Sequence, residues 1–430
     1  MKNKGWSLSI LAVFSLSLCF AQAVASQTQS RKGHVVVPQS SVVHPGDVGK
    51  MAHTNLLVMM PEGGPMPLSA NAKPNELPPI PGLFFETPAS LACLYRLVQH
   101  AKPGCNPDQT TQTATGGSGA IAIVDAFDDP NAASDLAIFS QIFGLPPADL
   151  TVVYAAGTQP GLDPSGGWEL EESLDIEYAH AMAPGARIFL VEAASSKGGD
   201  LFKAIVLASH LVAASGGGEV SMSFDFGGEF DLPTQSAFDT ELFTTPGVVY
   251  VASAGDAPGA VWPATSPNVI AAGGTSISRD SSTGNFILEN TWQITGGGPS
   301  AVEPRPHFQD RIARIVGPTR GTPDLSFDAN PNLGVWIVDT NLFEGTPGGF
   351  FIVGGTSVSA PSIAGIINNA GKFLPSSQAE NALIYRGVFS DDNDFRDITY
   401  GTCGVNVGDF AIFGWDFCSG VGSSTGLHGK

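Results

Sequence analysis

A serine in a glycine-rich turn is the first residue whose surroundings suggest chemistry. The apolar stretch at residues 350–353 predicts a strand, and Gly-Gly-Thr-Ser at residues 354–357 joins it to the small, apolar run at residues 358–366. Glycines allow a tight turn, and the free N–H groups at a helix start favour negative charge. We expect Pro361 in the first turn of that helix, where proline is tolerated. The pattern predicts a nucleophilic Ser357 beside donors for an oxyanion, although a bare Gly-Thr-Ser is more simply a helix cap.

Two carboxylates one helical turn apart are the second candidate. Apolar residues recur at roughly helical spacing in the segment 168–186, so Glu171 and Asp175 stack on one helix face. Two like charges there repel each other, and sharing a proton relieves the repulsion and raises one pKa. Such a pair can act as a carboxyl base with its orienting partner. The alternative is a solvated acidic helix face, because the segment holds three more glutamates: Glu169, Glu172 and Glu177.

The base that would serve Ser357 is a separate question. A subtilisin-type site needs an aspartate, a histidine in a His-Gly-Thr-His context and the serine, and Asp125 could fill the first role. None of the eight histidines stands in such a context. His180 has the best claim, since it follows Asp175 in the same helix, but a core or solvated histidine is the simpler interpretation. The absence of the histidine motif favours the carboxylate pair.

The chain resembles the sedolisin family, the serine-carboxyl peptidases. That family combines a Glu-x-x-x-Asp helix and an Ala-Pro-Gly-Ala stretch with a Gly-Thr-Ser-x-x-x-Pro serine, which here are Glu171, Asp175, residues 183–186 and Ser357. The resemblance implies that the glutamate is the general base and later the general acid, and that the aspartate orients and polarises it. It covers roughly residues 86–430, and three further segments match: 263–269, 273–275 and 296–300.

A third landmark is the Ser-x-Gly-Asp segment at residues 253–256. In the family that the chain resembles, this aspartate contributes to the oxyanion hole. An ionised Asp256 would repel the developing oxyanion, so it must act as a neutral donor. With a reference pKa of about 3.9, this requires an acidic medium, a strongly perturbed site, or both.

The C-terminal region resembles the calcium site of the same family, in which two aspartate side chains and three main-chain carbonyls bind one Ca²⁺. Carboxylate and carbonyl oxygens are the hard ligands that this ion prefers. The resemblance assigns Asp397 and Asp416 with the carbonyls of Ile398, Ile412 and Gly414 as a structural calcium site. The family usually has glycine at the position of Ile412, so that ligand depends on the backbone angles there. The alternative is an acidic loop held by a disulfide.

An α/β domain must position these residues. Apolar runs typical of buried strands alternate with helical stretches, which predicts a subtilisin-like, mostly parallel central sheet with helices on both faces. The predicted strands are residues 120–125, 150–154, 187–191, 219–223, 248–252, 269–272 and 334–338, and the predicted helices are 134–143, 171–182 and 199–213. We expect a signal peptide at residues 1–25, a loosely structured extension at residues 26–85 and one peptidase domain at residues 86–430. The extension is too short for the large folded propeptide of the family.

Charge and cysteines indicate the partners and the compartment. Asp and Glu (40) outnumber Lys and Arg (20), and the formal charge of −20 argues against nucleic acid and anionic lipid as partners. Lysines precede an apolar stretch at residues 8–20 that is too short to span a membrane, which is typical of an export signal. We expect a secreted or periplasmic monomer without membrane attachment after signal removal. The four cysteines beyond the signal predict two local disulfides: Cys93–Cys105 and Cys403–Cys418.

The predicted function is an acid-favouring endopeptidase that acts on protein or peptide substrates. Ser357 attacks the peptide carbonyl, Glu171 held by Asp175 takes its proton, and Asp256 with the N–H of Ser357 stabilises the oxyanion. Two alternatives stay open: a neutral subtilisin-type peptidase that uses Asp125 and an unrecognised histidine, and a non-catalytic, calcium-stabilised binding protein with the peptidase fold. A pH–rate profile separates the first, and reaction with an aldehyde transition-state mimic separates the second.

Overall fold

The computed structural model describes residues 33–68, 83–99, 102–389, 393–405 and 408–430, so the predicted signal peptide at residues 1–25 lies outside the described part. The strands are β1 Gly33–Val36, β2 His53–Thr54, β3 Leu57–Pro61, β4 Ala120–Ala126, β5 Asp149–Tyr154, β6 Arg187–Ala193, β7 Gly218–Met222, β8 Phe224–Asp225, β9 Val248–Ser253, β10 Ile270–Arg279, β11 Phe286–Thr291, β12 Gly298–Pro304, β13 Thr319–Thr322, β14 Leu325–Asp328, β15 Val335–Phe343, β16 Thr346–Gly354, β17 Phe395–Arg396 and β18 Ser423–Ser424. The α-helices are α2 Pro88–Leu94, α3 Ala132–Phe143, α4 Gly167–Met182, α5 Gly198–Ala214, α6 Leu232–Leu242, α7 Ala313–Val316, α8 Thr356–Ala370 and α9 Ser377–Ile384. In the described part of the chain, no helix is both long and apolar enough to cross a membrane.

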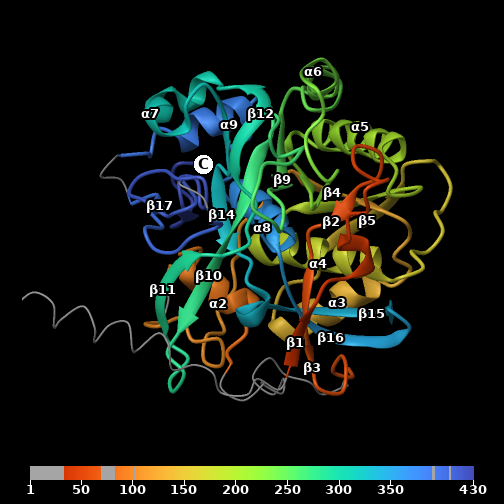
Figure 1. Ribbon diagram of the computed structural model, residues 1–430. Helices are drawn as coiled ribbons and strands as arrows, with labels where there is room; N and C mark the ends of the chain where they lie inside the picture. Colours follow the sequence, from red (N-terminus) through yellow and green to blue (C-terminus); the bar gives the residue numbers. More distant parts are fainter. Residues whose placement is uncertain (1–32, 69–82, 100–101, 390–392, 406–407) are drawn as a thin grey trace, which may run out of the picture.

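The centre of the protein is a ten-stranded sheet in the order β17-β18-β14-β10-β9-β7-β4-β6-β5, with β11 beside β10. Every neighbouring pair from β14 to β5 is parallel. Helix α5 covers one side of this sheet and α4 the other (Figure 1). The predicted fold class, an α/β, subtilisin-like protein with a mostly parallel sheet and helices on both faces, is confirmed.

Strand β4 shows why a continuous apolar run predicts a buried strand. Successive side chains of a strand point to opposite faces, and here Ile121 and Ile123 pack into one core cluster while Ala122 and Val124 pack into another. All seven residues of β4 are buried. A strand covered on both faces needs apolar residues at every position, so the run is continuous instead of alternating.

The strand predicted at residues 334–338 is present as β15, but it does not belong to the parallel sheet. It pairs antiparallel with β16 in a second sheet of four strands, in the order β1-β3-β16-β15. In Figure 1 this sheet lies at the lower edge of the molecule, below α3 and α4. Strand β16 leads directly into α8, so the second sheet forms the support from which the predicted serine turn starts.

The prediction of a loosely structured extension at residues 26–85 is wrong for its described part. Strand β3 pairs with β1 on one side and with β16 on the other, through Val58 opposite Val353. Leu56, Val58 and Met59 are at most 1% exposed and belong to the main core cluster. Short strands that are stabilised by partners far away in the sequence have little pattern of their own, so the sequence does not predict them.

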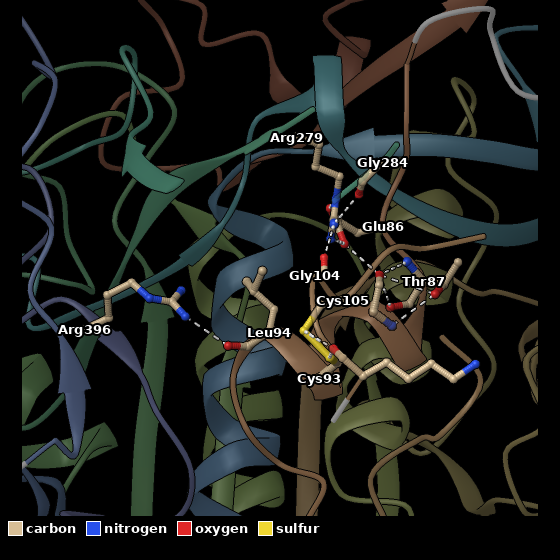
Figure 2. Close-up of a disulfide and its surroundings, with 11 residues drawn as sticks. Glu86, Thr87, Cys93, Leu94, Gly104, Cys105, Arg279, Gly284 and Arg396 are labelled. Carbon is tan, nitrogen blue, oxygen red and sulfur yellow. Dashed lines mark hydrogen bonds and ion pairs between the residues drawn. A yellow bond between two sulfur atoms is a disulfide. The ribbon is translucent and has the colours of Figure 1, made fainter. Parts of the chain in front are cut away.

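Both predicted disulfides, Cys93–Cys105 and Cys403–Cys418, are present. The first lies beside a buried ion pair that the sequence did not reveal (Figure 2). Arg279 Nε lies 2.5 Å from Glu86 Oε1, and Nη2 lies 2.6 Å from Oε2, so the pair is bidentate. Because both side chains are almost completely buried, the pair ties the chain before α2 to β10.

Candidate active site

Helix α4 carries the predicted acid pair through the interior. Asp163 Oδ2 accepts hydrogen bonds from the main-chain N–H groups of Gly167 at 3.0 Å and Trp168 at 3.2 Å, which supplies partners at the helix start. Every residue of α4 is buried, and Glu171 and Asp175 are 0% exposed. The alternative of a solvated acidic face is therefore wrong for this helix.

Helix α8 begins at Thr356, so Ser357 is its second residue, as the sequence predicted. The N-cap residue Gly355 has a φ of 103°, a backbone conformation that is strained for any residue with a side chain. A Cβ at this position would also lie only 2.5 Å from Asp256 Oδ2. Pro361 lies inside the helix and not in its first turn. Since proline has no N–H, the carbonyl of Ser357 loses its helical partner and instead accepts a long hydrogen bond of 3.4 Å from Ser223 Oγ.

The packing of α8 against α4 brings the serine to the acid pair. A Cβ on Gly365 would lie 2.6 Å from Met182 Cβ, so the glycine allows the two helices to touch. Burial raises the pKa of Glu171, and the nearby Ser357 offsets part of that rise. Its hydroxyl nevertheless donates to the carbonyl of Ser223 at 3.3 Å, and neither carboxylate oxygen of Glu171 has a hydrogen bond of normal geometry. Catalytic hydrogen bonds often tighten only when a substrate is in place.

Ser223 is a site residue that the sequence analysis did not single out. Its hydroxyl donates to Asp175 Oδ1 at 2.8 Å, so it holds the second member of the acid pair. It directly follows β7, at the carboxyl edge of the parallel sheet, where side chains of functional sites in such sheets gather. Its position at the end of a predicted strand was the signal that could have identified it.

The carboxyl groups around Ser357 retain protons strongly. Burial raises the pKa of Glu171 well above its ordinary value, and the charges of Asp175 and Asp125 raise it further. Burial and the charge of Asp125 likewise raise the pKa of Asp175, against the hydrogen bond from Ser223. Burial and the charge of Asp129 raise the pKa of Asp125 to about 8. Carboxyls that cannot all ionise share protons, which suits a carboxyl acid–base system.

Within the described residues, no histidine hydrogen-bonds to Ser357 or to Asp125. His180 Nε2 lies 2.8 Å from the carbonyl oxygen of Pro146, and burial lowers the pKa of this histidine. The neutral subtilisin-type alternative therefore lacks its base in the described part of the chain.

Asp256 reaches the start of α8 from the loop after β9. Its Oδ1 accepts from the N–H of Thr356 at 2.7 Å and from Thr356 Oγ1 at 2.9 Å, while Oδ2 is buried and has no hydrogen-bond partner in the described part of the chain. Burial raises the pKa of Asp256 to about 8 in spite of these two hydrogen bonds. A carboxyl that keeps its proton can donate to an oxyanion. The second expected donor, the N–H of Ser357, binds the carbonyl oxygen of Asn55 at 3.0 Å.

A second group of buried carboxyls lies on α4 beside the acid pair, and the sequence analysis did not find it. Among the described residues, neither carboxylate oxygen of Glu172 has a hydrogen-bond partner, and the side chain is 0% exposed. Burial and then the charges of Glu192 and Asp129 raise the pKa of Glu172 well above its ordinary value. Burial and the charge of Asp128 raise the pKa of Glu192 to about 9. The buried acidic network thus extends well beyond the residues next to Ser357.

The structure places the two expected calcium-binding carboxylates, Asp397 and Asp416, at the loop of residues 412–416 near the C-terminus. Asp397 Oδ2 accepts from the N–H of Gly414 at 2.9 Å, and Asp416 Oδ2 accepts from the N–H of Ile412 at 3.0 Å. Ile412 has no positive φ, so it meets no backbone strain at a position where the family usually has glycine. Asp397 and Gly414 also line a cavity of about 70 Å³, and Ile398 follows directly in the chain. The two carboxylates and the loop carbonyls are the type of oxygen ligand that a hard cation takes, although the cavity is lined by Asp397 and not by Asp416.

Comparison with known proteins finds peptidases that are similar to this chain in sequence. It is similar to kumamolisin from Bacillus sp. strain MN-32, with 31% identity over 309 residues, 64% of this chain and 52% of that protein. Tripeptidyl-peptidase 1 from Dictyostelium discoideum is 29% identical over 359 residues, 74% of this chain and 55% of that protein. No family model matches. The chain spans about half the length of these two relatives.

Among solved structures, Pseudomonas sedolisin, a serine-carboxyl proteinase in complex with pseudo-iodotyrostatin, has a TM-score of 0.62 at 21% identity. The match covers 80% of this chain and 96% of that one, and it supports the fold. This chain and that structure share a mostly parallel sheet with helices packed against it. The chain is thus similar in sequence to kumamolisin and sedolisin and shares the fold of sedolisin.

Proposed function

We propose that this chain is a serine-type endopeptidase that hydrolyses protein or peptide substrates and favours acidic pH. One observation carries the proposal: Ser357 meets the Glu171–Asp175 pair and Asp256 in one buried site, although these residues come from three separate parts of the chain. The similarity to tripeptidyl-peptidase 1 supports hydrolysis of peptide bonds.

In the proposed reaction, Ser357 Oγ attacks the substrate carbonyl carbon while Glu171 takes the hydroxyl proton. Asp256 and the N–H of Ser357 donate to the oxyanion, and Glu171 then protonates the leaving amine as the C–N bond breaks. Water hydrolyses the acyl-enzyme with the same glutamate as base, which regenerates the serine. Asp175, held by Ser223, positions Glu171 and shares its proton.

The proposed preference for acid follows from Asp256. This carboxyl donates to the oxyanion only while it is protonated, and burial is the main cause of its raised pKa. When the cleft opens to water for a substrate, that burial decreases and the pKa falls toward the ordinary value of about 3.9. We therefore expect Asp256 to keep its proton only at a lower pH in the open, substrate-binding enzyme than in the closed structure.

We propose further that one Ca²⁺ binds at Asp397, Asp416 and the carbonyls of Ile398, Ile412 and Gly414. The ion neutralises two partly buried carboxylates and fixes the C-terminal loops, without a part in the chemistry. We also propose export from the cytoplasm, to a secreted or periplasmic location, because both disulfides suit an oxidising compartment.

The direct test is Ser357→Ala with casein as the substrate at about pH 4. We expect hydrolysis to disappear while the circular dichroism spectrum and the melting temperature stay close to those of the wild type. Retained hydrolysis would remove Ser357 from the mechanism. A wild-type protein that neither hydrolyses casein nor reacts with a peptide aldehyde would instead support the non-catalytic alternative.

A further inference from the structure

Thr356 is the first residue of α8, and it connects the proposed nucleophile to the proposed oxyanion donor. The residue is 0% exposed and lies between the N-cap residue Gly355 and Ser357. Its main-chain N–H is one of the groups at a helix start that have no partner within the helix. Asp256 Oδ1 accepts this N–H at 2.7 Å, so a carboxyl group from the loop after β9 caps the helix.

The hydroxyl group of Thr356 has hydrogen-bond partners on two sides. The N–H of Gly255 donates to Thr356 Oγ1 at 3.1 Å, and Asp256 Oδ1 lies 2.9 Å from the same hydroxyl oxygen. A main-chain N–H can only donate, and a hydroxyl group has a single hydrogen. Among the described residues, Thr356 Oγ1 has no other acceptor, and a buried hydroxyl without an acceptor is costly. The hydroxyl therefore accepts from Gly255 and donates its hydrogen to Asp256.

These contacts distinguish the two carboxyl oxygens of Asp256. Oδ1 accepts two hydrogens, one from the N–H and one from the hydroxyl of Thr356. A proton on Oδ1 would crowd these two hydrogens, so the neutral carboxyl carries its proton on Oδ2. Oδ2 is buried and accepts no hydrogen bond from the described part of the chain. One oxygen of the carboxyl is therefore an acceptor and the other a donor.

Asp256 Oδ2 lies beside the place where an oxyanion would form. A Cβ on Gly355 would lie 2.5 Å from Oδ2 and 2.1 Å from the main-chain oxygen of Asn55. That main-chain oxygen accepts the N–H of Ser357, the other proposed oxyanion donor, at 3.0 Å. An oxygen bound by the N–H of Ser357 is therefore a neighbour of Oδ2. The absence of a side chain at Gly355 leaves room for this approach.

We propose that Thr356 is a positioning residue of the oxyanion hole, because its N–H and hydroxyl fix Asp256 Oδ1 as an acceptor and direct the proton on Oδ2 toward the substrate oxygen. This inference rests on the proposed peptidase function and adds the residue that orients its oxyanion donor. A carboxyl group without such partners can carry its proton on either oxygen. Donors in an oxyanion hole are effective because they are oriented before the reaction. In this role Thr356 acts only through Asp256.

The charges around Asp256 give this role a signature in the pH dependence. Burial raises the pKa of Asp256 to about 8, and the two hydrogen bonds from Thr356 oppose this rise. The charge of Asp225, in β8, raises the same pKa, and the charge of Asp256 raises the pKa of Glu171 on α4. Without the Thr356 hydroxyl, ionised Asp256 loses a donor, so its pKa should rise further. The proton would then be retained to higher pH but would be less well oriented.

The test compares Thr356→Val, which removes the hydroxyl at nearly constant size, with Thr356→Ser, which retains it. We expect Thr356→Val to lower kcat for peptide hydrolysis about tenfold with KM unchanged, which is less than the loss of a whole donor. The upper pH limit of activity should rise in the same variant, and Thr356→Ser should stay within about threefold of the wild type. Equal losses in the two variants, or a lower kcat without a shift of the pH limit, would overturn the proposal.

Thr340 provides a matched control, because it binds another buried carboxyl in the same way. Its N–H donates to Asp135 Oδ2 at 2.7 Å, and its hydroxyl donates to the same oxygen at 3.0 Å, where β15 meets α3. Asp135 is 1% exposed. Thr340→Val therefore removes the same kind of hydrogen bond and should leave kcat and the pH limit unchanged. A loss as large as that in Thr356→Val would mean that any such hydrogen bond matters equally, and it would contradict a specific role for Thr356.

A double variant separates this role from a direct effect of Thr356 on the neighbouring Ser357. In Asp256→Ala there is no carboxyl group to orient, so adding Thr356→Val should cause no further loss of kcat. Losses that multiply in the double variant would show that Thr356 acts through another group, and the proposal would fail.

A measurement without catalysis separates this inference from the proposed function. In protein labelled with ¹³C at the aspartate carboxyl groups, the signal that is missing from Asp256→Asn reports the titration of Asp256. We expect this carboxyl to titrate at higher pH in Thr356→Val than in the wild type, with or without hydrolysis of casein. A wild type that does not hydrolyse casein overturns the peptidase function, whereas an unchanged titration in Thr356→Val overturns the role of Thr356.

Discussion

Glu171 and Asp175 lie one turn apart on a helix that is buried along its whole length, and Ser223 holds the aspartate of the pair. Two like charges without solvent are costly unless a proton is shared. In the proposed mechanism this pair accepts and returns a single proton beside Ser357, and that role can be tested.

Replacing the proposed base should stop the reaction without unfolding the protein. Glu171→Gln keeps the size of the side chain but cannot accept a proton, so we expect kcat/KM to fall by about 10³-fold. Glu172→Gln changes the next, equally buried glutamate, whose pKa is raised by burial and by Glu192 and Asp129, and activity should stay within about threefold. Peptide hydrolysis by the two variants is the measurement. Equal losses would mean that buried charge matters in general and that Glu171 is not the base.

The oxyanion donor can be tested through the pH profile. Asp256→Asn keeps a neutral donor at every pH, so activity should stay within about tenfold at low pH and persist where the wild type declines. The wild type should lose activity as its aspartate deprotonates, at or below the pKa of about 8 that burial produces in the closed site. Asp256→Ala provides no donor and should lose about 10²–10³-fold in kcat. An unchanged pH limit in Asp256→Asn would contradict this role.

Buried carboxyls should make the fold more stable in acid. Burial raises the pKa of Asp125 from 3.8 to about 8, so the folded protein keeps a proton that the unfolded chain releases across that interval. The unfolded state then binds fewer protons, and the free energy of unfolding is highest below about pH 4 and decreases as the pH rises to about 8. One such group contributes about 1.4 kcal/mol per pH unit within the window. Asp125→Asn should flatten the dependence of the melting temperature on pH, and an unchanged slope would refute the assignment.

Removal of calcium should affect stability before it affects chemistry. A ligand held at about 100 times its dissociation constant stabilises the folded state by about 2.7 kcal/mol, which corresponds to several degrees in melting temperature. We expect a calcium chelator to lower the melting temperature, calcium but not magnesium to restore it, and Asp416→Asn to abolish the response. Asp149→Asn alters an exposed aspartate paired with Arg187 and should behave like the wild type. A chelator without effect on the wild type would rule out the site.

Local sequence patterns predict those parts of the site whose geometry depends only on residues close together in the sequence. The four-residue spacing of Glu171 and Asp175 requires only a helix, and the position of Ser357 requires only a strand, a glycine and a helix start. The apolar runs predicted the parallel strands because strands such as β4 are buried on both faces. The missing histidine motif predicts a carboxyl base, and within the described chain no histidine hydrogen-bonds to Ser357.

Other features exist only because distant segments meet. The burial of α4 depends on the helices and strands that pack around it. The acidic sequence of this segment alone is therefore equally compatible with an exposed helix. The role of Ser223 depends on the distance from the end of β7 to Asp175, and the Arg279–Glu86 pair joins residues that lie far apart in the chain. The N-terminal segment was predicted to be loosely structured. In its described part, however, β2 pairs with β8 and β3 pairs with β16. Side-chain periodicity and turn chemistry are local and can be read from the sequence, whereas burial and strand pairing depend on the partner, and only the tertiary structure supplies the partner.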